Sequence, residues 1–416
     1  MKIGYACILR GKNLRTNRSL ILRNFNEKKW MNLVNENLDD LEEILKYNFS
    51  NNIFMFRISS DILPFASHHI MKIDWKKLLK TKFSHISKYI KGTGMRVSMH
   101  PGQYTVLNSP REEIVKNSIS ELKYHADFLD ALEVDFSCKI ILHIGGVYGN
   151  KENAIQRFID NFEILPENVK KRLVIENDEK NYSIEDILKI CNVIKIPAIF
   201  DNLHDECFYN EKRDVKKIMS SVNQTWYKED GNQKIHYSQQ MIKNREGSHS
   251  RSIEIESFLH YYNQIKDFNP DIMIEVKDKD ISAIKCKLSI DESNGIFDKG
   301  KFYTQWENYK YYLMAKGKIF SEFPEKIFGN DLSFSKLYKY TDKNIYSEYD
   351  EKGLLDAAKE IWNLAAKKLT IREKNRFKKL INENNNHKKL IDFLYRISLK
   401  YGIDKIHNSY LFAYNF

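Results

Sequence analysis

The sequence predicts an α/β protein, a (β/α)8 barrel of the TIM type with an additional C-terminal helical region, and three observations lead to this prediction. Short apolar runs of strand length alternate with segments of helical period eight times within roughly the first 285 residues. The chain of 416 residues is long enough for such a barrel and an extension. No repeat of about 20 to 50 residues, which would indicate a solenoid, is visible. We therefore expect a barrel domain at 1–285, a linker at 286–300 and a helical extension at 301–416.

The eight expected strands are short runs rich in β-branched and aromatic residues. The third of them, in the stretch RVSMHPGQY, ends at His100, because Pro101 and Gly102 cannot continue a strand ladder. The eight runs occupy 2–8, 53–59, 96–100, 139–145, 172–177, 197–202, 233–238 and 271–276. Their alternation with helical segments is typical of a parallel sheet.

Segments of helical period separate these runs. Asp74 is the expected N-cap of a basic helix, Pro110 lies in the first turn of the next helix, and Ser183 with Asp186 forms a variant of the capping box. The segments cover 28–47, 74–92, 110–133, 154–162, 183–191, 213–227 and 252–268.

After about residue 290 the composition changes. A polar stretch at 291–301 with two glycines is typical of a linker. Beyond it Trp306 and three nearby tyrosines form an aromatic cluster, and Lys-rich helices are expected at 356–368 and 372–380. The basic residues of these helices are Lys367, Lys368, Arg372, Lys374, Arg376, Lys378 and Lys379. They could follow a phosphate backbone or form solvated helix faces, and the sequence is compatible with both.

Composition and cysteine usage restrict the class of protein. The net charge of +11 and the pI near 9.0 are compatible with a nucleic-acid partner, and equally with an organism whose proteins are rich in Lys and Asn. The five cysteines are odd in number and include no C-x-x-C pair, which favours reduced thiols over a disulfide framework or a zinc ribbon. No run approaches about 18 apolar residues, and the amino terminus is charged too soon for a signal peptide. We expect a soluble, cytoplasmic, monomeric protein without a membrane partner.

Ionisable side chains recur where the expected strands end. They are His100, His143, Glu176, Asp201 with His204 just beyond it, His236 and Glu275. Because the carboxyl ends of barrel strands share one face of the molecule, residues spread over about 175 positions should converge there. Imidazole and carboxylate ligands without cysteine are compatible with Zn, Mn, Fe or Co.

The number of these candidate ligands exceeds what one ion of four to six ligands can use. It indicates two or three metal ions that share at least one carboxylate, and two metals about 4 Å apart are typical of phosphodiester hydrolysis. On the loop after His100, Gln103 offers an amide and Tyr104 a flat ring, side chains suited to contact an unstacked base. The sequence therefore favours a phosphodiesterase or nuclease, although Tyr104 could also simply pack on the rim of the barrel.

Seven phrases in the same order carry a family resemblance. They are RISSDILPFASH at 57–68, SMHPGQY at 98–104, LHIGGVYGNK at 142–151, VIENDEK at 174–180, FDNLH at 200–204, KIHYSQQ at 234–240 and GSHS at 247–250. Together they closely resemble the UV damage endonuclease (UvdE) family, whose barrel and metal site are shared with endonuclease IV. The likeness covers roughly residues 1–285.

The resemblance implies a DNA repair endonuclease. UV damage endonucleases nick duplex DNA immediately 5′ to pyrimidine dimers and 6-4 photoproducts, leave a 3′-hydroxyl and a 5′-phosphate, and use metals of the Mn type. The residues that match the family's metal ligands are His100, His143, Glu176, Asp201, His204, His236, His249 and Glu275. Glu176 is the expected bridge between ions, and Lys234 matches a lysine that the family can carry carboxylated. Glu176, Lys234 and His236 are thus the expected catalytic residues.

The resemblance also implies residues that contact the substrate. Gln103 and Tyr104 match a pair that wedges into the helix while the damaged dinucleotide is flipped out. Tyr5 and His68 match positions that face the substrate, whereas Leu9 stands where relatives have Asn.

Other interpretations of the same residues are possible. His204 and His249 lie on expected loops and could be ordinary surface histidines, and Lys234 could be unmodified and paired with a carboxylate. Alternative functions are abasic-site incision, sugar isomerisation in a barrel with two metals, and DNA-damage binding without catalysis. The basic charge and the Gln103–Tyr104 pair argue against the isomerase, because its substrate is small and neutral.

Overall fold

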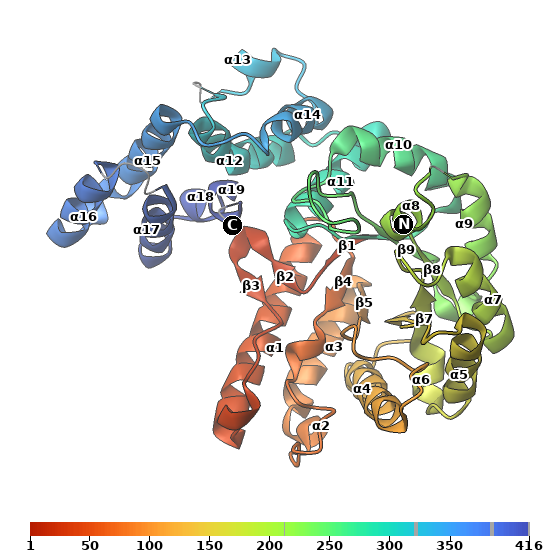
Figure 1. Cartoon of the computed structure of the whole chain (residues 1–416). Coiled ribbons are helices and arrows are strands. Elements are labelled where there is room, and N and C mark those ends of the chain that lie inside the picture. Colours follow the sequence, from red (N-terminus) through yellow and green to blue (C-terminus); the bar gives the residue numbers. More distant parts are fainter. Residues whose placement is uncertain (212, 320–322, 383–386, 415–416) are drawn as a thin grey trace. The chain divides into compact units, whose positions relative to one another are not determined.

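The computed structural model describes residues 1–211, 213–319, 323–382 and 387–414. These residues form two compact units. The barrel unit comprises Met1–Ile8, Leu14–Arg251 and His260–Lys279, and the C-terminal unit comprises Leu9–Asn13, Ser252–Leu259 and Asp280–Phe416. Figure 1 shows the first unit in red to green around the parallel strands and the helical second unit mainly in blue. Among the described residues, no helix combines the length and the apolar character needed to cross a membrane.

The barrel unit contains a closed sheet of eight parallel strands that neighbour one another in chain order (Figure 1). The strands are β1 (Ile3–Ala6), β4 (Met55–Ile58), β5 (Arg96–Met99), β6 (Ile140–His143), β7 (Leu173–Glu176), β8 (Ala198–Asp201), β9 (Lys234–Tyr237) and β10 (Asp271–Ile274). All eight predicted strands are present, and the prediction of a (β/α)8 barrel is confirmed. Two further short strands, β2 (Ile8–Leu9) and β3 (Leu14–Arg15), pair with each other after β1.

Helices follow the strands as the periodicity predicts. They are α1 (Glu27–Ser50), α2 (Trp75–Leu78), α3 (Lys80–Thr93), α4 (Glu112–Ala131), α5 (Lys151–Glu163), α6 (Glu167–Arg172), α7 (Ile184–Ile194), α8 (Asn202–Tyr209), α9 (Val215–Asn223) and α10 (Ile255–Ile265). The capping box of α7 is present: the Ser183 hydroxyl accepts from the Asp186 amide at 3.2 Å, and the Asp186 carboxylate accepts from the Ser183 amide at 3.1 Å.

Two predicted helices differ from the observed ones. Asp74 does cap a helix, but the predicted segment 74–92 divides at Leu79 into α2 and α3. The predicted segment 213–227 ends early because residues after Asn223 bind the backbone of β8. The Thr225 hydroxyl accepts from the Ala198 amide at 2.9 Å, and the Trp226 indole donates to the Ala198 carbonyl at 2.8 Å. Tertiary hydrogen bonds therefore override the helical pattern there.

Charged and polar side chains fill parts of the barrel interior, starting at the amino ends of the strands. Arg96 lies 3.0 Å from Asp271 across the barrel and also donates to the carbonyls of Ser137, Asp230 and Asn232. Because strand side chains alternate in direction, Ser98 and then His100 follow Arg96 on the same face. The interior side of β5 thus leads from this ion pair to the opposite, carboxyl end of the barrel.

The expected linker at 286–300 is largely helical. Helix α11 (Asp280–Ser293) runs through its first part, and α12 (Lys299–Ala315) begins before its end. Polar residues of α11 are buried instead of exposed: the ammonium of Lys285 is 2.5 Å from Asp342 and donates to the Ser252 hydroxyl at 3.0 Å. Lys285 directly precedes the expected linker, and within it Glu292 accepts from the amides of Phe334 and Ser335, each at 2.8 Å, whereas residues 293–300 are exposed.

The C-terminal unit has an aromatic core. Trp306 and Tyr309 on α12 are buried, and the Tyr309 ring lies 4.7 Å from that of Tyr410 and 6.2 Å from that of Tyr338. The aromatic cluster noted in the sequence is thus part of a core. The remaining helices are α13 (Glu325–Phe328), α14 (Phe334–Asn344), α15 (Glu351–Ala365), α16 (Ile371–Ile381), α17 (His387–Lys400), α18 (Asp404–His407) and α19 (Tyr410–Ala413).

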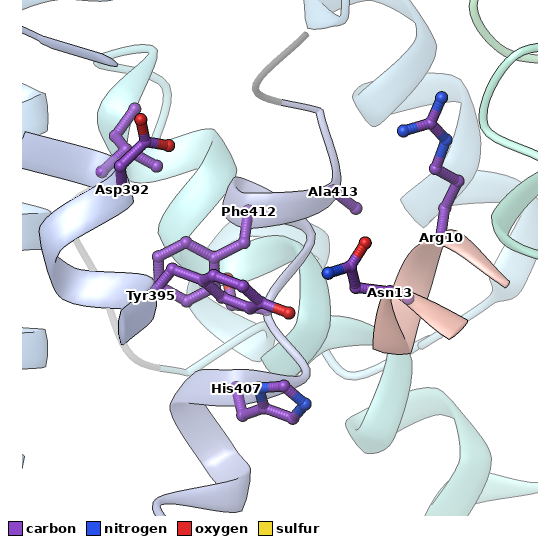
Figure 2. A pocket seen from close by; sticks show the side chains of 10 residues that line it. Arg10, Asn13, Asp392, Tyr395, His407, Phe412 and Ala413 are labelled. Atoms are coloured by element: carbon purple, nitrogen blue, oxygen red, sulfur yellow. The ribbon is translucent and has the colours of Figure 1, made fainter. Parts of the chain in front are cut away.

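A polar pocket of about 210 Å³ lies within the C-terminal unit (Figure 2). Its walls include the short helix η1 (Arg10–Lys12), whose first amide, that of Arg10, donates to Asp280 at 2.6 Å. The centroid of the Tyr395 ring, which lines this pocket, lies 5.5 Å from that of His407 and 5.2 Å from that of Phe412. Asn13, on the chain segment after η1, reaches toward Tyr395 in Figure 2.

Candidate metal centre and active site

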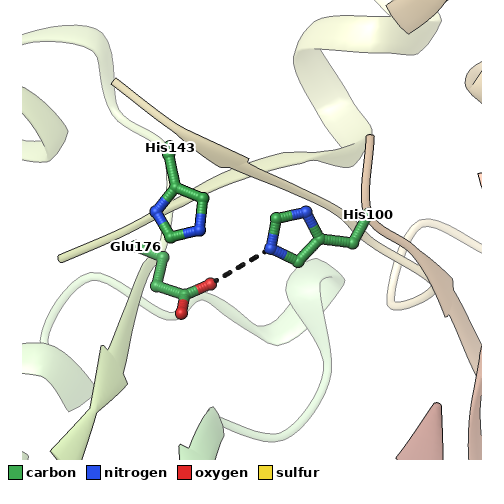
Figure 3. A group of neighbouring side chains, drawn as sticks. All are labelled: His100, His143 and Glu176. Atoms are coloured by element: carbon green, nitrogen blue, oxygen red, sulfur yellow. Dashed lines mark ion pairs between the residues drawn. The ribbon is translucent and has the colours of Figure 1, made fainter. Parts of the chain in front are cut away.

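Glu176, at the end of β7, is the centre of a cluster of imidazoles and carboxylates. His100 follows β5 and His143 ends β6, and Figure 3 shows both rings turned toward the Glu176 carboxylate. The His100 Nε2 atom is 3.5 Å from Glu176 Oε2, and the centroids of the two imidazole rings are 5.2 Å apart. These three residues can place one ligand atom each within 4.8 Å of one another, which is close enough to hold a single ion.

A second set of ligand atoms shares the same carboxylate. Glu176, Asp201 and His236 also place ligand atoms within 4.8 Å of one another, and the His236 Nδ1 atom is 3.1 Å from Glu176 Oε2. His204 lies near the other oxygen of this carboxylate, with Nδ1 3.4 Å from Glu176 Oε1 and 3.9 Å from Asp201. Glu176 therefore belongs to both groups of potential ligands.

Glu275 and a buried guanidinium extend the cluster. Glu275 Oε1 is 3.2 Å from His236 Nδ1 and accepts a hydrogen bond from Arg57 of β4. Burial opposes ionisation of Glu275, but Arg57 and His236 outweigh it and hold the pKa of this carboxyl well below its usual range. Glu275 is thus a carboxylate at neutral pH.

Backbone carbonyls fix the tautomers of two histidines. A carbonyl can only accept, so His100 Nδ1, 3.0 Å from the Pro101 oxygen, and His204 Nδ1, 2.9 Å from the Asn177 oxygen, each carry a proton. In the neutral form of each ring the lone pair is then on Nε2. Metal-binding histidines are typically held by such a bond from their other nitrogen.

Several buried polar atoms of the cluster make no hydrogen bond to any of the described residues. They include His143 Nδ1, Asp201 Oδ2 and both ring nitrogens of His236. Buried groups of this kind are normally satisfied, so their arrangement fits ligands that face a cation. Burial also lowers the pKa of His143 to about 4, which leaves its ring neutral at neutral pH, as metal ligation requires.

The carboxylates make the cluster attractive to positive charge. Burial acts to lower the pKa of His204, yet Asp201 and Glu176 outweigh it and raise this pKa to about 11. Burial likewise opposes ionisation of Glu176, but His236 and His143 lower its pKa well below the usual range. The donor set and its negative charge thus fit divalent metal ions.

Lys234 lies deeper in the barrel, two residues before His236 on β9. Its ammonium is buried and donates to the Ser98 hydroxyl at 2.8 Å. Burial, together with the charges of Arg96 and Arg57, lowers the pKa of Lys234 well below its usual range. The sequence left open an unmodified Lys234 paired with a carboxylate, and the hydrogen bond that its nitrogen makes here is to the Ser98 hydroxyl.

His249 is placed beside the cluster by a loop. It forms an antiparallel bridge with Gln240, and its ring centroid is 6.5 Å from that of His204. All eight residues that the sequence suggested as ligands are therefore neighbours in one cluster, although His249 is the most peripheral.

The four suggested substrate contacts are placed differently from one another. Gln103 and Tyr104 are exposed on the loop after His100, and Tyr104 is 72% exposed. His68 is half-buried on the loop after β4 and packs on the exposed His69, with ring centroids 4.1 Å apart. Tyr5 is not brought to the rim, because its buried hydroxyl points to the helix layer and donates to Asn48 of α1 at 2.7 Å.

Sequence reasoning missed two residues that support the cluster. Arg57 is a lone charge in the apolar run of β4, a pattern that could have indicated an interior partner for a carboxylate. Asn177 holds Asp201 in place: its amide donates to the Asp201 carbonyl at 3.0 Å and accepts from the Asp201 amide at 2.9 Å. No pattern in the sequence pointed to this bond.

The fold and the cluster define a class of protein, a (β/α)8 barrel with buried histidines and carboxylates at the carboxyl ends of its strands. Within this class the chain belongs to the UV-endonuclease UvdE family, whose model matches residues 3–307.

Individual relatives agree with this assignment. The UV DNA damage endonuclease of Clostridium perfringens (strain 13 / Type A) is 48% identical over 389 residues, which cover 93% of this chain and 94% of the relative. The UV DNA damage endonuclease of Bacillus cereus (strain Q1) is 34% identical over 283 residues, 67% of this chain and 89% of the relative. The crystal structure of SacUVDE is similar with a TM-score of 0.67 and 40% identity, and the match covers 71% of this chain and 99% of that one.

These matches extend the likeness beyond the expected limit near residue 285. The family model continues to residue 307, and the Clostridium perfringens relative matches all but a small part of the chain. Much of the C-terminal unit is therefore shared with at least one relative.

Proposed function

We propose that this protein is a metal-dependent endonuclease that nicks duplex DNA immediately 5′ to UV photoproducts, pyrimidine dimers and 6-4 photoproducts, and leaves 3′-hydroxyl and 5′-phosphate ends. The observation that carries this proposal is the buried cluster around Glu176, found in a chain of the UvdE family. Relatives named UV DNA damage endonuclease support the choice of substrate. The free thiols of Cys7, Cys138, Cys191 and Cys207 support a reducing compartment, and we propose that the protein acts as a cytoplasmic monomer.

Two or three divalent ions would be held by the cluster, with Mn as the favoured metal and Zn, Mg or Co as alternatives. One would lie at His100, His143 and Glu176, and another at Glu176, Asp201 and His236, so that Glu176 is shared. His204, His249 and Glu275 are the remaining ligand candidates. When bound, such ions supply positive charge that stabilises the negative charge developing on a phosphate during in-line hydrolysis.

The chain's own residues prepare the site for this chemistry. Arg57 keeps Glu275 ionised, and the carbonyl of Asn177 orients the His204 ring. Because burial and nearby Arg side chains favour the neutral amine of Lys234, its nitrogen can bond to the carbon of CO2 and release a proton, which leaves a carboxylated lysine. We propose that Lys234 is modified in this way and then contributes an oxygen ligand.

Exposed residues on the loop after β5 would engage the lesion. Gln103 and Tyr104 are exposed enough to enter a DNA duplex from its surface. We propose that they take the place of the damaged dinucleotide in the base stack. His68, half-buried on the loop after β4, is a further candidate for contact with the substrate.

A cleavage assay tests the proposal directly. Purified protein with Mn²⁺ is incubated with matched duplexes that contain a cyclobutane dimer, an abasic site or no lesion, and the ends are mapped. We expect incision 5′ to the dimer. Preferred cutting of the abasic duplex would favour an enzyme of the endonuclease IV type, and binding without cutting would favour a non-catalytic protein.

Glu176→Gln should abolish cutting, because a neutral amide is a poor shared ligand for two cations. Glu167→Gln is the matched control, since it makes the same change on a side chain of α6 that is 77% exposed. Substantial cutting by the Glu176→Gln protein would refute the role assigned to Glu176.

A metal analysis and the intact mass of the same preparations identify the ions and show whether Lys234 carries the extra carboxyl group.

A further inference from the structure

The positive charge of this protein is concentrated in one segment of the C-terminal unit. Residues 366–400 contain eleven Lys and Arg side chains and three Asp and Glu side chains, a net charge of +8 out of +11 for the chain. The rest of the chain therefore carries a net charge of only +3. A lysine-rich composition spread evenly over the chain would not produce this distribution, so the segment is a candidate surface for a polyanion.

Helix α16 turns five of these cations away from the core of its unit. Phe377 is buried and stacks on Trp362 of α15, with ring centroids 4.0 Å apart and planes at 3°, and Leu380 is buried as well. At 3.6 residues per turn, the cations fall outside the arc that contains these apolar residues. This α16 cationic face consists of Arg372, Lys374, Arg376, Lys378 and Lys379, all of which are exposed.

The acidic residue within α16 does not neutralise this face. Glu373 accepts from the Thr370 amide at 2.8 Å in a capping box, lies 2.7 Å from the ammonium of Lys400 and accepts from the Tyr401 hydroxyl at 2.7 Å. Its carboxylate is thus turned toward residues at the end of α17 and away from the α16 cationic face.

Other exposed helices of the protein mix the two signs of charge. Lysine ammonium groups lie 2.8 Å from Glu42 on α1, 3.1 Å from Glu112 on α4 and 2.8 Å from Asp127 on α4, each four residues apart in sequence. On α16 the corresponding neighbours are like charges, Arg372 with Arg376 and Lys374 with Lys378. Like charges at this spacing destabilise a helix, and a partner with closely spaced negative charges would relieve their repulsion.

We propose that the α16 cationic face is a docking surface for the phosphate backbone of duplex DNA outside the lesion, independent of base sequence. This inference rests on the proposed function, which makes duplex DNA the polyanion that the protein meets. From Arg372 to Lys379 the face spans about 10 Å of helix axis, and one strand of duplex DNA carries a phosphate about every 3.4 Å along its axis, so about three phosphates of one strand are within reach. Exposed Lys and Arg of this kind bind phosphates by releasing counterions.

The test compares two variants of the full chain that have equal net charge with a third that keeps the charge of the unmodified protein. The first replaces four members of the face, Arg372→Gln, Lys374→Gln, Arg376→Gln and Lys378→Gln. The matched control removes four exposed lysines at α7 and α9 of the barrel unit, Lys189→Gln, Lys195→Gln, Lys216→Gln and Lys217→Gln. A third protein keeps the charges of the face by Arg372→Lys, Lys374→Arg, Arg376→Lys and Lys378→Arg.

The readout is the affinity for an undamaged 30-base-pair duplex as a function of salt. We expect the first variant to bind about 30-fold more weakly at low salt, and its slope of log K against log salt to shrink by about 2.7, or 0.9 for each of three phosphates. The control and the charge-preserving variant should stay within about twofold of the unmodified protein. Thermal unfolding and metal content of all four proteins should agree.

Each other outcome has a definite meaning. Equal losses in the first variant and the control, or no loss in either, would overturn the proposal. Unchanged duplex binding combined with lost binding to vesicles containing phosphatidylglycerol would overturn it in favour of a membrane partner. If the unmodified protein fails to cut the dimer duplex while only the first variant loses duplex binding, the proposed function fails and the docking surface stands.

Discussion

Arg57 shows how one buried side chain sets the charge of the candidate metal centre. Its guanidinium contacts Glu275, and both side chains are nearly buried, 13% and 11% exposed. Arg57→Met should therefore destabilise the metal-free protein by about 3 kcal/mol, because it leaves a buried carboxylate without its cation. Urea unfolding at pH 7 in the presence of a chelator measures this loss.

Arg57→Lys is the control, since it keeps the positive charge and should lose less stability. The pH dependence gives a second check. Because the pKa of Glu275 is lowered in the folded protein, its contribution to stability is present above the unfolded pKa of about 4.3 and is lost as the pH falls through the folded pKa. In the Arg57→Met protein this acid-induced loss of stability should be smaller. If the Arg57→Met protein is as stable as the unmodified protein at pH 7, the ionised form of Glu275 does not depend on Arg57.

Tyr104 is the residue whose exposure is most informative about DNA. Because base–aromatic stacking is worth about 1–3 kcal/mol, Tyr104→Ala should weaken binding to a dimer-containing duplex by that amount and leave the metal content unchanged. The control is Tyr227→Ala, which removes a 49% exposed tyrosine that precedes β9 and so lies toward the other end of the barrel. Loss of metal in the Tyr104 variant would instead make this tyrosine a structural residue.

At the scale of single elements, the cap of α7 is the local feature that the sequence predicted most directly. Ser183→Ala should cost about 1 kcal/mol in the free energy of unfolding, because the Asp186 amide loses its acceptor. Urea unfolding measures the change, and Ser183→Thr should retain most of the stability. An unchanged midpoint for the Ala variant would show that α7 is held by its buried apolar face alone.

Element ends were harder to predict than element types. The helix predicted to Tyr227 stops at Asn223, because Thr225 and Trp226 bind the backbone of Ala198. The polar stretch expected as a linker is helical up to Ser293, where Glu292 accepts from the amides of Phe334 and Ser335 inside the C-terminal unit. In both cases the deciding partner is distant in sequence, so a local pattern could not reveal it.

At the scale of the whole molecule, bound ions should stabilise the folded protein. A ligand at a hundred times its dissociation constant adds about 2.7 kcal/mol, which is about 5 °C in the unfolding midpoint of a domain of this size. Chelation should therefore lower the midpoint and Mn²⁺ should restore it, as measured by calorimetry. In the Glu176→Gln protein the response to Mn²⁺ should be much smaller, and an equal response there would place the stabilising ions elsewhere.

The sequence by itself determined the barrel and the members of the candidate metal centre. Alternating apolar runs and helical segments are sufficient to indicate a parallel barrel, and a barrel brings strand ends such as His143, Glu176 and Asp201 to one face. The family phrases added His249 and Lys234, which no periodicity would have identified.

Only the tertiary structure decided how these residues are held and which others support them. It directs Tyr5 to Asn48 and away from the rim, sets Arg57 against Glu275, and turns Glu373 away from the cations of α16. The physical reason is that direction, burial and pairing depend on contacts between segments far apart in the chain, whereas periodicity reports only which residues share a face.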